Sequence, residues 1–371
     1  MRSAAVVGTG LIGTSIALAL SAKGVTVYLV DKEPVTALAA AAVGAGRAEE
    51  PAEAVDLAVL AVPPAELAAT LAQAQKRGLA RAYTDVASVK GRPMADIVDL
   101  GCDLTSFVGG HPMAGGERSG PLAARANLFE GRVWVLSPHP ATSEWARQAV
   151  ESMITTCGAY PLVMKPGEHD AAVGLVSHAP HVVASLMAAR LEHAAELEIG
   201  LAGQGVRDVT RIAAGDPGLW LDVLSANAGT VADTLTELGR DLESVIKALR
   251  HLEAGGTEEA SDRGAEEVLL DVLNRGVAGC EKLPNKHGAP KVSYVTLSVP
   301  VGDQPGELAR LFADIGATGM NVEDVFIDHA PGKTAGVVEL LVTPEVADLL
   351  AQSLKDRDRI AIEAPEPEST V

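Results

Sequence analysis

The 371-residue chain is long enough for two or three domains rather than a single hydrophobic core. Its 49 acidic and 30 basic side chains give a formal charge of −19, which argues against nucleic acid as a partner, since that polyanion needs clustered Lys and Arg. With 47% hydrophobic but only 3% aromatic residues, the core must consist mainly of Ala, Val and Leu, and aromatic stacking is not expected in recognition.

Cysteine usage and the N-terminal sequence bear on the compartment. The three scattered cysteines form no CxxC pair and cannot make a framework of paired disulfides, so we expect reduced structural thiols at Cys102, Cys157 and Cys280. The N-terminus enters strand-like sequence without the features of a signal peptide. No window has the uninterrupted apolar length that a membrane span needs. A soluble cytoplasmic protein is expected.

The first predicted domain spans residues 1–165. Short β-branched runs alternate there with Ala-rich helical stretches, a pattern typical of a parallel sheet wrapped by helices. The sequence therefore predicts an α/β fold with a doubly wound, Rossmann-type domain. Its expected strands are Ala4–Val7, Val25–Val30, Asp56–Val62, Ala82–Val86, Thr105–Val108, Val133–Leu136 and Tyr160–Met164.

A second, all-helical domain is predicted for residues 166–273. Strand signals stop after Lys165-Pro166-Gly167, and residues 168 to about 253 are rich in Ala, Leu and Glu. Part of this region has apolar residues at helical spacing, which form a stripe along one helix face. Such a stripe usually packs against another helix or a second subunit, so we expect a homodimer. The stripe lies between residues 235 and 252 and consists of Leu238, Leu242, Val245, Leu249 and Leu252.

The remaining chain divides into a linker and a third domain. Residues 274–291 have the Gly, Pro, Lys and His composition of a linker, after a short helix around 265–273. Residues 292–371 follow a βαββαβ pattern, which predicts a small α+β domain. Its expected strands are Val292–Val299, Asn321–Ile327, Val337–Val342 and Ile360–Ile362, and its expected helices are Gly306–Gly316 and Pro344–Leu354.

A glycine-rich turn follows the first strand. Gly8-Thr9-Gly10-Leu11-Ile12-Gly13 matches GxGxxG between a strand and a helix, the context in which this motif binds dinucleotides. Glycines permit the tight turn and let a pyrophosphate approach the backbone N–H groups at the helix N-terminus. Alone the motif is weak evidence, since such turns also serve only to pack a strand on a helix. The backbone of Val62 and Pro63, beyond a later strand, could line the nicotinamide ribose.

An acid at the end of the second strand strengthens the motif. Asp31 lies about 20 residues beyond the glycines, where a carboxylate can accept both ribose hydroxyls. Because it would repel a 2′-phosphate, NAD is favoured over NADP as the cofactor. Lys32 weakens that choice, since a basic residue there could tolerate the phosphate, although a solvated lysine is the plain alternative.

Two strand ends carry reactive side chains. Ser88 lies in DVASVK and His111 in GGHPMAGGE, and both should reach the same crevice. Ser88 alone is more often a helix cap than a catalyst. His111, in a glycine-rich loop beyond a strand, is poorly explained by core packing, and by itself it is equally compatible with a catalytic and a structural role.

The helical region holds two further polar clusters. His178 and His181 are three residues apart, but no third or fourth ligand is apparent nearby and Pro180 indicates a helix start, so no metal is expected. Arg207 and Arg211 would share one helix face, with Asp208 able to pair with Arg211. Two cations held together in an acidic chain indicate a carboxylate site, and a solvated helix face is the alternative.

Taken together, these motifs resemble the prephenate dehydrogenase family. GTGLIG, DVASVK, GGHPMAGGE, SHAPH and VRDVTRIAAGDPGLW occur in the family's order and approximate spacing across nearly the whole chain. The departures are Ala179, where the family often has leucine, and Gly116, where a threonine that touches substrate is frequent. That one substrate contact is therefore in doubt.

The resemblance implies an activity and roles for single residues. Prephenate would be oxidised at ring C4 by NAD and lose carbon dioxide to give 4-hydroxyphenylpyruvate, a step of tyrosine biosynthesis. His111 would accept the proton of the C4 hydroxyl, and Ser88 would hydrogen-bond the same hydroxyl or His111. The implied substrate-binding residues are Arg211, Arg207 and His181, with Glu117 and Asp208 as pocket residues that orient these cations.

The C-terminal domain looks like an ACT domain. In related modules two loops bind amino acids at a domain interface, which here implies tyrosine as an effector; the alternative is that the module only assembles subunits. These loops hold Asp303, Gln304 and Gly306, and Asn321 and Val322. Three other readings of the chain stay open, namely an arogenate dehydrogenase, another two-domain reductase of hydroxy acids or imines, and a non-enzymatic regulator that binds NAD and an amino acid.

Overall fold

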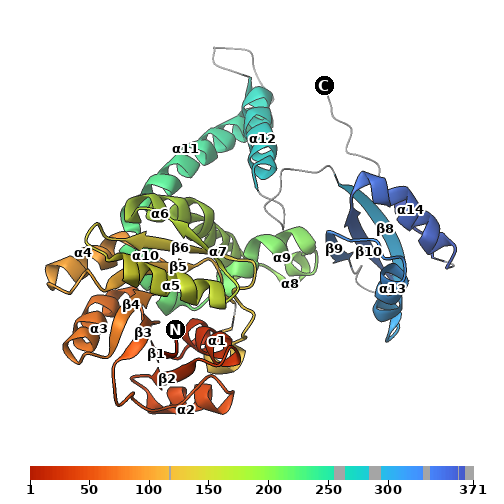
Figure 1. Cartoon of the computed structure of the whole chain (residues 1–371). Coiled ribbons are helices and arrows are strands. Elements are labelled where there is room, and N and C mark those ends of the chain that lie inside the picture. The colour runs from red at the N-terminus through yellow and green to blue at the C-terminus, as the bar shows by residue number, and fades with distance from the viewer. Residues whose placement is uncertain (117, 255–263, 284–293, 329–334, 358, 364–371) are drawn as a thin grey trace. The chain divides into compact units, whose positions relative to one another are not determined.

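The computed structural model describes residues 1–116, 118–254, 264–283, 294–328, 335–357 and 359–363 (Figure 1). The chain divides into two compact units, Met1–Arg240 and Asp241–Val371. Each unit is described by itself below. The predicted glutamate at position 117 lies outside the described residues.

The first unit is built on a seven-stranded sheet with the order β2-β1-β3-β4-β5-β6-β7. The first five of these strands are parallel, as predicted. However, β6 pairs antiparallel with β5, and β7 pairs parallel with β6, so the expectation of a wholly parallel sheet is wrong at one edge. The strands are β1 Ser3–Val7, β2 Thr26–Val30, β3 Val55–Leu60, β4 Ala80–Asp85, β5 Phe107–Pro112, β6 Val133–Pro138 and β7 Tyr160–Val163.

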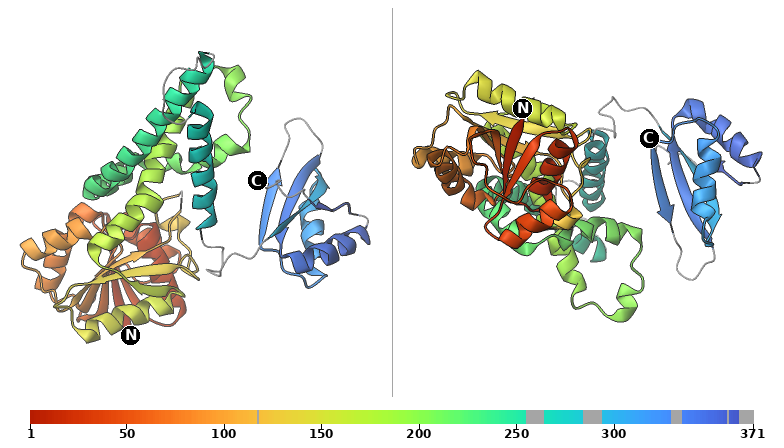
Figure 2. Two further views of the ribbon diagram at one scale, coloured as in Figure 1. Left: turned by 90° about the horizontal axis from the view of Figure 1, so that it is seen from above. Right: turned by 60° about the horizontal axis from the view of Figure 1, so that its bottom comes forward.

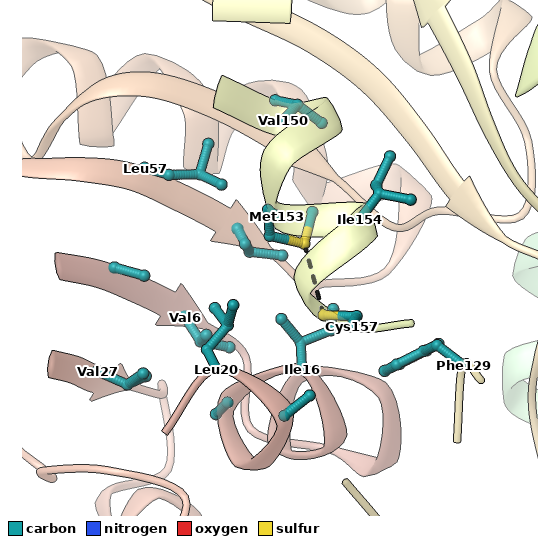
Figure 3. Close-up of a cluster of buried hydrophobic side chains, with 14 of the residues drawn as sticks. Val6, Ile16, Leu20, Val27, Leu57, Phe129, Val150, Met153, Ile154 and Cys157 are labelled. Atoms are coloured by element: carbon teal, nitrogen blue, oxygen red, sulfur yellow. Dashed lines mark hydrogen bonds between the residues drawn. The ribbon is translucent and has the colours of Figure 1, made fainter. Parts of the chain in front are cut away.

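Helices cover both faces of this sheet, which confirms the Rossmann-like arrangement (Figures 1 and 2). Helices α1, α2 and α5 contribute to one buried cluster, which includes Ile16 and Leu20 of α1 and Val150 and Met153 of α5 (Figure 3). Helices α3 and α4 contribute to a second cluster. The helices are α1 Leu11–Ala22, α2 Pro34–Ala42, α3 Pro64–Lys76, α4 Gly91–Asp99 and α5 Glu144–Thr156, with a short 3-10 turn at Pro121–Ala123.

Aliphatic side chains fill the cores, as the composition predicts. Ala, Val and Leu dominate both clusters, and burial of apolar surface stabilises the fold by roughly 25 cal/mol per Å². Cys157 is buried against Met153 (Figure 3). All three cysteines are free thiols.

Consecutive helices follow the sheet, as predicted. Their bounds are α6 Pro166–Val173, a π-helical turn at Gly174–His178, α7 Ala179–Leu191, α8 Glu196–Ile199, α9 Gln204–Thr210, a 3-10 turn η3 at Arg211–Ala214, α10 Pro217–Ala226 and α11 Ala228–Glu253.

The helical run from Pro166 to Leu191 is long and apolar enough to cross a membrane by length and composition, contrary to the sequence expectation. A single run of this kind is weak evidence, because a core helix of a soluble protein passes the same test. Here the run carries the buried polar residues His169, Asp170, His178 and His181. These residues make contacts within the first unit, and 33% of the run's most apolar window is buried.

The second unit contains the end of α11, the helix α12 Ala265–Glu281 and a small sheet domain. Since α12 reaches Glu281, the first part of the predicted linker is helical rather than extended. Arg275 of α12 pairs with Asp241 of α11 through two hydrogen bonds of 3.1 and 2.9 Å. The later part of that linker lies outside the described residues.

The C-terminal domain has the predicted order of elements. Its four-stranded sheet has the order β11-β8-β10-β9, and all three pairings are antiparallel. Residues Leu297, Val299, Leu311, Leu340 and Leu350 are fully buried within its own core. The elements are β8 Val295–Gly302, α13 Glu307–Gly316, β9 Asp324–Asp328, β10 Ala335–Val342, α14 Pro344–Lys355 and β11 Ile362–Glu363.

Candidate active site

The glycine loop after β1 has the geometry that the motif requires. Gly8 has a φ of 94°, and a Cβ built there would lie 2.2 Å from the carbonyl oxygen of Ala61. A Cβ at Gly13 would lie 2.0 Å from the carbonyl oxygen of Gly8. Both positions therefore demand glycine. A Cβ at Gly10 would meet nothing within 4 Å, so the loop leaves open space where a pyrophosphate can approach the backbone.

Asp31, at the end of β2, is anchored to this loop. Its Oδ2 accepts hydrogen bonds of 2.7 and 2.8 Å from the backbone N–H and the hydroxyl of Thr9, and Oδ1 accepts one of 3.0 Å from the N–H of Glu33. Lys32 instead pairs with Glu66 at 3.0 Å on the exposed first turn of α3, and that hydrogen bond is the main cause of its raised pKa. The carboxylate, rather than the lysine, therefore belongs to the loop.

Four other residues predicted to contact the cofactor lie at the expected edge of the sheet. Val62 and Pro63 follow β3 directly, and Pro63 is the cap residue of α3. Leu11 and Ile12 open α1 and pack against the adjoining core. Because β1, β3, β4 and β5 are parallel, their carboxyl ends meet at this same edge.

Ser88 follows a strand as predicted, whereas His111 does not lie beyond its strand. His111 lies within β5, paired with Val135 of β6, and not in a loop beyond the strand. Ser88 lies beyond the end of β4 at Asp85. Among the residues that the structure describes, no hydrogen bond joins Ser88 to His111.

A buried carboxylate links the two strand ends. Asp85 Oδ1 accepts the N–H of Gly110 at 2.9 Å, and Oδ2 accepts the N–H of Ala87 at 3.0 Å. The Lys90 ammonium also donates to Oδ2, and both side chains of this ion pair are at most 2% exposed. Asp85 therefore holds the Ser88 loop against the strand that carries His111.

The partner of His111 is a second histidine that the sequence analysis did not single out. The Nδ1 atom of His111 lies 2.8 Å from Nε2 of His169 on α6. The Nδ1 atom of His169 lies 2.7 Å from Oδ1 of Asp170. Asp170 also accepts the N–H groups of Lys90 at 2.8 Å and Gly91 at 2.7 Å, at the N-terminus of α4. A buried hydrogen-bonded chain of three side chains results.

The surroundings of His111 favour its neutral form. Burial is the main cause that holds the pKa of His111 well below its ordinary value of 6.5, and the Lys90 cation and two neighbouring histidines add to the effect. Burial also lowers the pKa of Lys90, although Asp85 opposes this. A neutral imidazole at neutral pH is able to accept a proton from a substrate hydroxyl.

The two histidines of SHAPH have different surroundings. His178 is 1% exposed and receives a hydrogen bond of 3.1 Å from the side-chain amide of Asn227, and burial lowers its pKa to about 4. His181 stacks on Trp220, with ring centroids 3.5 Å apart. In the described part of the chain, no group of three or more His, Cys, Asp or Glu residues could hold a metal ion.

The predicted arginines are not on one continuous helix face. Arg207 lies in α9, which ends at Thr210, and Arg211 begins η3. Asp208 accepts a hydrogen bond of 2.7 Å from the Gln204 side chain. The η3 turn packs against α7, and beyond it a Cβ at Gly215 would lie 3.3 Å from Cε1 of His181. The segment of Arg211 therefore adjoins His181, although it is not arranged as predicted.

A glycine loop with an anchored acid and, along the same sheet edge, a neutral imidazole define a nucleotide-dependent dehydrogenase. The profile of the prephenate dehydrogenase nucleotide-binding domain matches residues 16–162, and that of the prephenate dehydrogenase dimerization domain matches residues 165–262. The chain belongs to the prephenate dehydrogenase family.

Individual relatives agree with this assignment. The chain is 41% identical to a probable prephenate dehydrogenase of Streptomyces niveus, covering 96% of this chain and 98% of that protein. It is 27% identical to a prephenate dehydrogenase of Bacillus subtilis, covering 90% of each. The solved prephenate dehydrogenase of Aquifex aeolicus, in complex with hydroxyphenyl propionate and NAD+, has a TM-score of 0.64 at 27% identity and covers 76% of this chain and 97% of that one. The match to the nucleotide-binding domain, together with the NAD+ in the Aquifex structure, confirms the prediction of NAD as the cofactor.

Proposed function

We propose that the protein catalyses the NAD-dependent oxidative decarboxylation of prephenate to 4-hydroxyphenylpyruvate. The observation that carries this proposal is the position of His111 in β5, at the sheet edge that also carries the glycine loop, where burial lowers the pKa of its imidazole. The names of the relatives support the substrate. The solved Aquifex enzyme is in complex with NAD+ and hydroxyphenyl propionate. That ligand has a phenol and a carboxylate, and the proposed product has the same two groups.

The residues of this chain supply the proton chemistry of that reaction. His111 accepts the proton of the C4 hydroxyl, so that a C4 carbonyl can form as the hydride leaves C4. The acceptor of this hydride would be supplied by NAD+ bound at the glycine loop. The bond between the ring and its carboxylate then breaks, carbon dioxide departs, and the bonding electrons complete the aromatic ring. Protonation of the C4 oxygen gives the phenol and leaves His111 neutral again.

Cationic residues would bind the two carboxylates of prephenate. Arg211 and Arg207 are the proposed partners, because η3 and α9 both pack against α7, the helix that carries His181. His181, stacked on Trp220, would line the same pocket. Glu117 and Asp208 are proposed to orient the cations, and Ser88 is proposed to hydrogen-bond the C4 hydroxyl.

A steady-state assay tests the proposal. We expect NADH formation with prephenate and NAD, and a much lower kcat/KM with NADP, because Asp31 repels a 2′-phosphate. Arogenate, which has an amino group in place of the keto oxygen, is the matched second substrate. Faster turnover of arogenate would assign the protein to that rival reaction, and no turnover of either would refute the enzyme proposal.

We further propose that the C-terminal domain is an ACT domain that binds tyrosine. A pocket of about 380 Å³ is lined by Asp303, Gln304 and Gly306, with Leu308 and Ile327 as apolar walls. Of the other predicted regulatory residues, Asn321 pairs with Glu323 and Val322 packs against the core, so neither lines this pocket. A charged and apolar lining fits an amino acid with a ring.

Calorimetric titration of the whole chain with tyrosine tests this role. We expect Gln304→Ala to weaken both tyrosine binding and any inhibition by tyrosine, whereas Asn321→Ala, outside the pocket, serves as the control. Tyrosine binding that is unchanged in Gln304→Ala would refute the proposed site.

We also propose a homodimer formed through the helical domain. The match to a dimerization domain supports it, as do the exposed side chains Leu242 and Leu249 on α11 and Leu273 and Val277 on α12. Burying such side chains against a second copy would remove their apolar surface from water.

A further inference from the structure

The side chains of His111, His169 and Asp170 form one hydrogen-bonded chain from β5 to the N-terminus of α4. His169 is fully buried and Asp170 is nearly so. Neither residue has a role in the reaction proposed above. Their contact with His111 bears on which nitrogen of His111 carries its proton.

The directions of these hydrogen bonds follow from Asp170. Burial tends to raise its pKa, but the hydrogen bonds from His169 and from the N–H groups of Lys90 and Gly91 outweigh it, and the pKa lies below its ordinary value. Asp170 is therefore a carboxylate, which can only accept hydrogen bonds. The N-terminus of α4 also stabilises a negative charge there.

A carboxylate at Asp170 fixes the protons along the chain. His169 must place its proton on Nδ1, which donates to Asp170, so its Nε2 is an acceptor when the ring is neutral. His111 must then donate from Nδ1 to that acceptor. The lone pair of neutral His111 is thereby left on Nε2.

We propose that His169 and Asp170 are positioning residues that lock His111 in the Nδ1–H tautomer, with Nε2 as the atom that takes the substrate proton. This inference rests on the proposed function for the identity of that proton. A histidine held in the wrong tautomer would present an N–H donor where the reaction needs a base.

The same chain also accommodates the charge that forms during the reaction. When Nε2 of His111 takes up a proton, the resulting cation is disfavoured by burial and by Lys90. The Nδ1 proton of His111 can pass to Nε2 of His169 over 2.8 Å, which leaves His111 neutral and His169 cationic. That cation would lie 2.7 Å from the Asp170 carboxylate, a favourable ion pair.

Nitrogen NMR of the full-length protein, labelled with ¹⁵N in its histidines, tests the tautomer without any turnover. The signals of His111 are assigned by their loss in His111→Gln. We expect protonated Nδ1 and unprotonated Nε2 for His111 at pH 7.5. The opposite tautomer in the wild-type protein would overturn the proposal.

Two matched substitutions of His169 separate a relay from mere packing. The amide of Gln reaches the position of Nε2 and can offer an acceptor to His111, whereas that of Asn reaches only the position of Nδ1, beside Asp170. We expect His169→Asn to lower kcat about 100-fold and His169→Gln about 10-fold or less, with the KM for prephenate changed less than about threefold in both.

Asn227→Ala is the structural control. Asn227 donates to the backbone carbonyl of Asp170 at 2.8 Å and to His178, so its loss disturbs the same helix but leaves the three-membered chain intact. We expect its kcat to stay within about threefold of the wild type. Thermal unfolding of each variant shows whether it is folded.

Equal kcat values for folded His169→Gln and His169→Asn would refute the positioning role. If wild-type protein turned over neither prephenate nor arogenate, the proposed function would fail, whereas the NMR result would still decide the tautomer. The two failures are therefore distinguishable.

Discussion

The polar side chains around His111 and the apolar side chains on α11 and α12, which include the stripe predicted on α11, have opposite surroundings. Around His111, carboxylates, imidazoles and an ammonium are buried, and each has a hydrogen-bond partner in the same chain. Among the described residues, the indole nitrogen of Trp134 is the one buried side-chain N or O atom without a partner. On α11 and α12, by contrast, Leu242, Leu249, Leu273 and Val277 are each more than half exposed.

One chain by itself provides the partners of the buried polar groups, but it leaves the apolar side chains of α11 and α12 exposed to solvent. Burying a charge costs several kcal/mol unless it is paired, so the polar groups near His111 must be held by the fold itself. Apolar side chains in water cost less individually and can be covered by a second subunit. The proton chemistry is thus expected to survive changes on the stripe, and the assembly to survive changes near His111.

The largest expected effect is on kcat when the proposed base is removed. His111→Gln keeps a similar volume but has no basic nitrogen, so we expect kcat with prephenate to fall by about 10²- to 10⁴-fold. The oligomeric state should not change. His193→Gln, at an exposed position, is the control, and a His111→Gln rate within a few-fold of wild type would contradict the role.

The glycine loop provides a paired test of fold against cofactor binding. Gly8→Ala places a Cβ against the Ala61 carbonyl at a positive φ and should destabilise the protein by about 1–3 kcal/mol in urea unfolding. Gly10→Ala meets no protein atom, so the free energy of unfolding should hardly change while NAD binding weakens. Unchanged NAD affinity in Gly10→Ala would place the pyrophosphate elsewhere.

The other half of the comparison concerns assembly. A double change Leu242→Glu with Leu249→Glu puts two charges on the α11 stripe and should shift a dimer towards monomer in sedimentation velocity. Lys247→Glu, on another side of the same helix, should leave the dimer intact. A dimer that persists in the double variant would show that the stripe is not the interface.

The free energy of unfolding should depend on pH through the titration of His178. The unfolded chain binds this proton near pH 6.5, whereas folded His178 has a pKa of about 4, so protons favour unfolding between these values. The free energy of unfolding should therefore fall as pH drops from 6.5 towards 4. His178→Gln should flatten this dependence in urea titrations, and an identical slope would contradict the assigned cause.

The smallest effect is expected at Lys32. Because this side chain is exposed and paired with Glu66, Lys32→Ala should alter the ratio of kcat/KM for NAD and NADP by less than about threefold. Asp31→Ser, which removes the carboxylate on the glycine loop, should change that ratio much more. A reversed ranking would make Lys32 the determinant of cofactor choice.

Much of the fold could be predicted because the signals are local. β-Branched runs and glycine turns mark β1 to β4, and helical spacing marks α6 to α11. The extension of β5 through Gly109, Gly110 and His111 could not be read from propensity, because glycine is a poor strand former. That extension depends on antiparallel pairing with β6, a contact between distant segments.

The site was predicted only where a motif marked it. The glycine loop, Asp31 and the neighbourhood of His111 were found by position after strands, whereas His169 and Asp170 sit in a helix of ordinary composition. Their contact with His111 spans 58 residues of sequence and exists only in the folded chain. No local signal separates them from an ordinary helix face, because the same helix also carries the exposed Glu168 directly before His169. The prediction that Arg207 and Arg211 share one face of a single helix was wrong, because α9 ends between them.

The most direct test of the central claim follows prephenate through one turnover in the presence of NAD. We predict that NADH, carbon dioxide and 4-hydroxyphenylpyruvate appear in equal amounts with wild-type protein, and that all three are lost together in His111→Gln. NADH formation without carbon dioxide, or product formation undiminished in His111→Gln, would contradict the account.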